Sequence, residues 1–62
     1  MKVGEIWTHK KDESIQLTIL EYLNNDMWKV IYVNTYGDDG SPYDKIAGSV
    51  IFKYFYLLQK SK

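Results

Sequence analysis

The chain has 62 residues, enough for one small domain and too few for two. Eight lysines balance eight acidic residues and arginine is absent, so the basic excess and the guanidinium contacts typical of nucleic-acid-binding proteins are both missing. Without cysteine there are no disulfides or thiolate metal sites, and no apolar run approaches the ~20 residues of a membrane span. We therefore expect residues 1–62 to form a single domain, stabilised by packing of its many apolar side chains. Residues 1–5 do not resemble a signal peptide, which favours a cytoplasmic protein.

The first part of the chain predicts two strands joined by a charged turn. Residues 3–9 are predicted as the first strand, and residues 10–13 as the turn. Residues 14–23 alternate between apolar and polar side chains, the period of a half-buried strand. The apolar positions of this alternation are Ile15, Leu17 and Ile19.

A hairpin and a third strand are predicted next. Residues 24–26 read Asn-Asn-Asp, and these residue types tolerate the left-handed backbone of a tight turn. Residues 27–36 are dense in Trp, Val, Ile and Tyr and predict a strand, although both of its faces are partly apolar and the buried face stays open. Residues 37–42 contain two glycines and a proline, so we expect a loop there.

The last third of the chain has two interpretations. Its apolar residues fall at helical spacing, which favours one continuous amphipathic helix. Gly48, the β-branched residues and the near absence of a polar face argue against that helix. We predict instead that Ser49 caps a single helical turn over residues 50–53 and that residues 55–59 form a final strand.

The order of these elements resembles a small Src-homology-3-like (SH3-like) barrel. The resemblance lies in the opening Val3-Gly4-Glu5-Ile6-Trp7 and in the closing Phe52-x-x-Phe55-x-x-Leu58, and it extends to short uncharacterised phage and prophage proteins of that architecture. It implies an all-β domain of five strands, with the single helical turn before the last strand. Closing the sheet on itself would also shorten two exposed edges.

Two polar clusters contain residue types that can bind metal ions. His9 is the only histidine and lies close to Asp12 and Glu13, but these residues fall in and around a tight turn with nothing to fix their geometry. We interpret this cluster as a solvated hairpin.

The second cluster comprises Asp38, Asp39 and Asp44, which lack the ligand spacing of a calcium loop and are interpreted as a solvated acidic turn. With one histidine, no cysteine and little room for a deep cleft, we expect no metal, no cofactor and no enzymatic activity.

The aromatic residues exceed what so small a domain can bury. We expect some of them to form an exposed patch, with Tyr36 and Tyr43 outside because they flank the glycine-rich loop. The candidate binding residues are Trp7, Trp28, Tyr32, Tyr36, Tyr43 and Tyr54.

These observations predict a non-enzymatic module that binds a protein, such as a phage- or prophage-encoded protein acting on a bacterial host factor. A homodimer through the same patch is a variant of this hypothesis. The alternative is single-stranded nucleic-acid binding, in which bases stack on aromatic residues flanked by lysines, and this is less favoured because the net charge is zero. The candidate lysines are Lys10, Lys11, Lys29 and Lys53.

Overall fold

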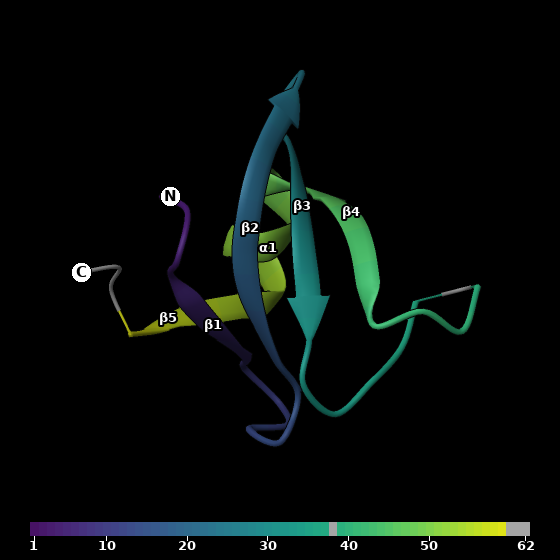
Figure 1. Cartoon of the computed structure of the whole chain (residues 1–62). Coiled ribbons are helices and arrows are strands. Elements are labelled where there is room, and N and C mark those ends of the chain that lie inside the picture. The colour runs from purple at the N-terminus through teal and green to yellow at the C-terminus, as the bar shows by residue number, and fades with distance from the viewer. Residues whose placement is uncertain (38, 60–62) are drawn as a thin grey trace.

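The computed structural model describes residues 1–37 and 39–59, and these form five strands and one helix. The elements are β1 (Ile6–His9), β2 (Gln16–Asn24), β3 (Met27–Tyr32), β4 (Tyr43–Ala47), α1 (Gly48–Tyr54) and β5 (Phe55–Gln59). All pairings are antiparallel, in the order β4-β3-β2-β1-β5 (Figure 1). The prediction of a mostly β domain with a short helix before the last strand is confirmed.

The path of the chain explains this order. Four strands follow one another as a meander, and α1 then carries the chain from β4 at one edge of the sheet to β5 at the other, beside β1. The sheet is bent, so that β1 and β5 run across the direction of β3 and β4 (Figure 1). The last strand therefore lies beside the first.

The turn between β2 and β3 has the predicted left-handed backbone. Asn25 has φ 49° and Asp26 has φ 61°, and Asn24 pairs with Met27 across them. Two consecutive residues with positive φ match the twist of a two-residue hairpin, which is why Asn and Asp are favoured there. The predicted hairpin is confirmed.

The predicted third strand is too long. β3 ends at Tyr32, because its pairing with β4 begins at Tyr43 and the Tyr32 N–H already donates to the Pro42 carbonyl at 2.7 Å. Residues 33–36 have strand-like composition but follow the last residue of β3 that pairs with β4. The first strand is also shorter than predicted: Gly4 has φ 93°, so the extended backbone begins at Ile6.

Every element except β4 contributes to the buried core. Its members are Trp7, Leu17, Ile19, Val30, Ile51 and Phe55. The alternation predicted for β2 is confirmed, since Leu17 and Ile19 are fully buried. The question left open for β3 is answered as well: Val30 is fully buried, and Trp28 and Tyr32 on the same face pack against the core.

The start of α1 differs from the prediction. Ser49 is not the cap: Ala47 occupies the N-cap position and makes no side-chain cap hydrogen bond. Instead Asp26 of the β2–β3 turn supplies both acceptors, because the Ser49 N–H donates to its Oδ2 at 3.1 Å and the Gly48 N–H to its carbonyl at 2.7 Å. A Cβ on Gly48 would lie 2.5 Å from Asp26 Oδ1, so any larger residue there would displace the carboxylate that accepts the Ser49 N–H.

The end of α1 agrees with the prediction of a short helix followed by a strand. Phe55 is the C-cap, with extended backbone at φ −125° and ψ 160°, and its N–H donates to the Ile51 carbonyl. β5 then spans the predicted residues, Phe55–Gln59. The alternative prediction of one continuous helix in the last third of the chain is therefore wrong.

Removing the Asp26 carboxylate should destabilise the domain. We expect Asp26→Gly to lower the free energy of unfolding by about 1 kcal/mol, because glycine keeps the left-handed backbone but cannot accept the Ser49 N–H. The matched control is Asn25→Gly, in the same turn and also at positive φ. Urea denaturation followed by tryptophan fluorescence measures both variants, and equal losses would contradict the capping role.

Candidate binding surface

The six predicted binding aromatics fall into three groups: three are exposed, two are half-buried and one is buried. Tyr36, Tyr43 and Tyr54 are 69%, 48% and 46% exposed, which confirms that the aromatic surplus reaches the surface and that Tyr36 and Tyr43 lie outside. Trp28 and Tyr32 are half-buried and pack against the core. The six therefore do not form one exposed surface: Tyr43 and Tyr54 line different hollows and Trp7 is in the core.

Trp7 does not belong to the predicted exposed aromatic patch, because it lies in the core with only 5% of its surface exposed. It lies on β1 between β2 and β5, and its Nε1 donates to the Glu5 carboxylate at 3.4 Å. Glu5 is itself buried and also accepts the Lys2 N–H at 2.6 Å. A buried indole whose N–H has a partner is stable inside, so Trp7 leaves the set of candidate binding residues.

Exposed apolar side chains instead follow one another along α1 and β5. They occupy alternate positions and are between 39% and 56% exposed. We call them the α1–β5 surface, and its residues are Val50, Phe52, Tyr54, Tyr56 and Leu58. Alternate residues share one face on the strand β5, whereas on the helix α1 they lie about 200° apart, so Phe52 projects from a different side of α1 than Val50 and Tyr54. Sequence reasoning named only Tyr54 among them. The near absence of a polar face in this segment was the pattern that pointed to the others.

Neighbouring groups hold three of these rings in place. Phe52 packs edge-on against Trp7, with ring centroids 5.2 Å apart. Lys53 Nζ lies 5.3 Å from the centroid of the Tyr54 ring, and the Tyr56 hydroxyl donates to Glu13 Oε1 at 3.4 Å. A surface whose side chains are already ordered loses less conformational entropy when it binds a partner.

A basic hollow adjoins the α1–β5 surface at Tyr54. It has a volume of about 340 Å³ and is lined by His9, Lys10, Lys11, Lys53 and Tyr54. Among the described residues no acidic side chain lines it, and the Lys10 ammonium donates to the Phe52 carbonyl at 3.2 Å near the end of α1. Three lysines gathered in a chain of zero net charge make this hollow suited to an anionic group.

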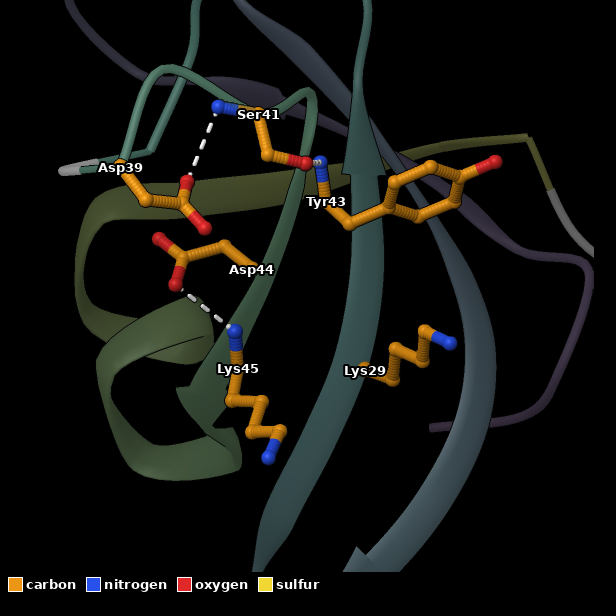
Figure 2. A pocket seen from close by; sticks show the side chains of 6 residues that line it. All are labelled: Lys29, Asp39, Ser41, Tyr43, Asp44 and Lys45. Carbon is orange, nitrogen blue, oxygen red and sulfur yellow. Dashed lines mark hydrogen bonds between the residues drawn. The ribbon is translucent and has the colours of Figure 1, made fainter.

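A second hollow lies beside β3 and β4 and has mixed charge (Figure 2). It has a volume of about 400 Å³ and is lined by Lys29, Asp39, Ser41, Tyr43, Asp44 and Lys45. Lys29 Nζ lies 5.5 Å from the centroid of the Tyr43 ring. Because both signs of charge line it, this hollow selects no ligand of one charge.

The carboxylates of the second hollow accept hydrogen bonds from local backbone groups and, at Asp44 Oδ2, from the Tyr32 hydroxyl at 3.4 Å. Asp39 Oδ1 accepts the Ser41 N–H at 2.9 Å and Asp44 Oδ1 accepts the Lys45 N–H at 2.8 Å (Figure 2). The exposed Asp39 thus lies in a turn, as the composition of this loop predicted. Asp38, the third member of the predicted acidic turn, lies outside the described residues.

The polar side chains of the cluster around His9 and Asp12 also form hydrogen bonds within their own turn. His9 Nδ1 accepts the Lys11 N–H at 3.1 Å, and Asp12 Oδ1 accepts the Ser14 hydroxyl at 2.6 Å and the Ser14 N–H at 3.1 Å. The hydrogen bond from the Ser14 hydroxyl, and to a smaller extent the one from the Ser14 N–H, lower the pKa of Asp12 below its ordinary value of 3.8. Desolvation has a smaller effect that raises this pKa. Within residues 1–37 and 39–59, no three His, Asp or Glu side chains gather as a metal site.

Comparison with known proteins finds no match: no family model, no curated protein and no solved structure is significantly similar to this chain. The resemblance to phage proteins therefore stays a prediction. No helix in the described part of the chain is long and apolar enough to cross a membrane.

Replacing Ser14 should change the acid titration of Asp12. We expect Ser14→Ala to raise the pKa of Asp12 towards 3.8, because the variant loses the hydroxyl that donates the strongest of the hydrogen bonds favouring the carboxylate. A lowered folded-state pKa stabilises the fold above pH 3.8 and loses that effect as the pH falls through the folded-state value. NMR titration of the Asp12 carboxyl measures the shift. Ser49→Ala is the control, and an unchanged Asp12 pKa in Ser14→Ala would contradict the assignment.

Proposed function

We propose that this chain is a small non-enzymatic SH3-like barrel that binds another protein through the α1–β5 surface. The observation that carries the proposal is the run of five exposed apolar side chains on α1 and β5. The barrel assignment is supported by the strand order, in which a last strand returns beside the first after one short helix. A phage or prophage protein that acts on a bacterial host factor is the biological setting we propose.

The composition of the α1–β5 surface suits a protein partner. Tyrosine and phenylalanine provide large apolar area with few rotatable bonds, and such residues are enriched at the centres of interfaces. The tyrosine hydroxyls add groups that can hydrogen-bond to a partner. An apolar surface of this kind, on a chain with zero net charge, favours a partner recognised by shape and apolar contact.

A charge placed on the α1–β5 surface should weaken protein binding. We expect Leu58→Lys to reduce affinity for the captured partner by about tenfold or more, since an ammonium at an apolar interface must be desolvated. Val33→Lys is the matched control, because Val33 is an exposed aliphatic residue outside this surface.

The measurement is capture from a bacterial lysate, identification of the bound protein by mass spectrometry and titration of that protein. Equal binding by both variants, or no partner for the unmodified chain, would count against the proposal.

One observation favours nucleic-acid binding as a second candidate. The fold brings three of the four predicted lysines, Lys10, Lys11 and Lys53, into one hollow beside Tyr54. A ring next to lysines is the arrangement on which single-stranded nucleic acids stack their bases. Lys29 lies in the other hollow and takes no part.

Single-stranded DNA titration at several salt concentrations tests this candidate. For single strands, each neutralised phosphate contributes about 0.7 to the slope of log affinity against log salt. We expect the triple variant Lys10→Gln, Lys11→Gln, Lys53→Gln to reduce that slope by about 2, and Lys29→Gln to leave it unchanged. The absence of binding at low salt would eliminate the candidate.

A further inference from the structure

The two edges of the sheet are protected differently. Proteins keep exposed edge strands from pairing with other chains by placing charged residues or proline on them. β4 carries Asp44 and Lys45, and its Tyr43 and Lys45 N–H groups donate to Ser41 Oγ and Asp44 Oδ1. β5 reads Phe-Tyr-Leu-Leu-Gln and contains no charged residue and no proline. The β5 edge is therefore the less protected one.

The backbone groups of Leu57 point to the open side of β5. The Lys10 N–H donates to the Tyr54 carbonyl, and Thr8 pairs with Tyr56, so these residues of the β5 segment direct their groups towards β1. Alternation directs those of Phe55 and Leu57 away from β1. Phe55 agrees with this, since its N–H donates to the Ile51 carbonyl of α1.

Leu57 faces Trp7 in the register of β1 and β5, but its N–H and carbonyl point away from β1. Among residues 1–37 and 39–59, no turn, loop or cap hydrogen bond involves either group. Leu57 therefore offers one donor and one acceptor to an added strand.

We propose that the first partner of the α1–β5 surface is a second copy of this chain, which adds its own β5 antiparallel to β5. This inference rests on the proposed function, because it names the protein bound at the same surface. Leu57 of each copy would lie at the two-fold axis and exchange two backbone hydrogen bonds with its counterpart. The two sheets would then form one continuous sheet.

The side chains of β5 fit this self-pairing. With Leu57 at the axis, Tyr56 of one copy lies opposite Leu58 of the other, and both residues are exposed in the single chain. Leu58 lies at the irregularity of the β1–β5 pairing, where Trp7 pairs with Leu57 and Ile6 with Gln59. An aromatic residue opposite an aliphatic one is a favourable cross-strand pair. No charged residue of Phe55–Gln59 meets a like charge, and the net charge of zero adds no repulsion between copies. Two β5 strands can therefore pair without charged residues of opposite sign facing each other.

Sedimentation equilibrium over a wide range of concentrations tests the proposal. The unmodified chain should show a monomer–dimer equilibrium. A chain made by chemical synthesis with N-methyl-Leu57 keeps every side chain but loses the donor at the axis, and its dimer should be about tenfold weaker or more. Leu58→Lys should weaken the dimer as well, whereas Val33→Lys should leave it unchanged. Circular dichroism verifies that each variant is folded.

The outcomes separate this inference from the proposed function. A chain that stays monomeric at millimolar concentration overturns self-pairing. In that case the loss of a captured partner in Leu58→Lys still supports a protein-binding surface. A dimer that forms equally well with N-methyl-Leu57 overturns strand addition, because the copies would then associate without the Leu57 N–H. A dimer weakened by N-methyl-Leu57 and by Leu58→Lys, but not by Val33→Lys, supports the proposal.

Discussion

The hydrogen bonds that Asp26 accepts from Gly48 and Ser49 hold the start of α1 against the β2–β3 turn, and the orientation of the helix follows from this contact. They join the β2–β3 turn to residues more than twenty positions later in the chain. With its first turn held there, the helix directs Ile51 into the core, where that side chain is fully buried. The same rotation leaves Val50, Phe52 and Tyr54 outside. The contact that closes the fold thus also determines which side chains form the α1–β5 surface.

The division of aromatic residues between core and surface follows from hydrogen-bonding needs as well as from size. The indole N–H of Trp7 finds the buried carboxylate of Glu5, so the largest side chain type can be enclosed without an unsatisfied donor. Tyr54 and Tyr56 keep their hydroxyl ends near solvent, where the Tyr56 hydroxyl reaches Glu13. Phe52 has no polar group to satisfy and is nevertheless exposed, which makes it the least expected member of the surface.

Local patterns predicted much of the fold, and long-range pairing accounts for what they missed. The alternation in β2, the Asn-Asp turn and the strand Phe55–Gln59 depend on neighbours in sequence, and all three are confirmed. The end of β3 depends on where β4 begins, which composition does not reveal. The cap of α1 comes from Asp26, while local reasoning chose Ser49 because serine is a common cap. For the site, Tyr36 and Tyr43 were predicted correctly as exposed, but of the α1–β5 surface only Tyr54 was predicted, because the exposure of the others depends on how α1 and β5 pack on the core.

The exposed residues of α1 and β5 are not explained by the stability of the single domain. Apolar burial stabilises a fold by about 25 cal/mol for each Å² removed from water, and side chains near half exposure contribute only part of this. Ser49, Lys53 and Gln59 show that the same segment accepts polar side chains at exposed positions. Five apolar residues at the remaining exposed positions therefore exceed what folding requires. Their burial against a further protein surface would give them the stabilising role that the isolated domain does not, and the uncharged β5 edge lies within the same segment.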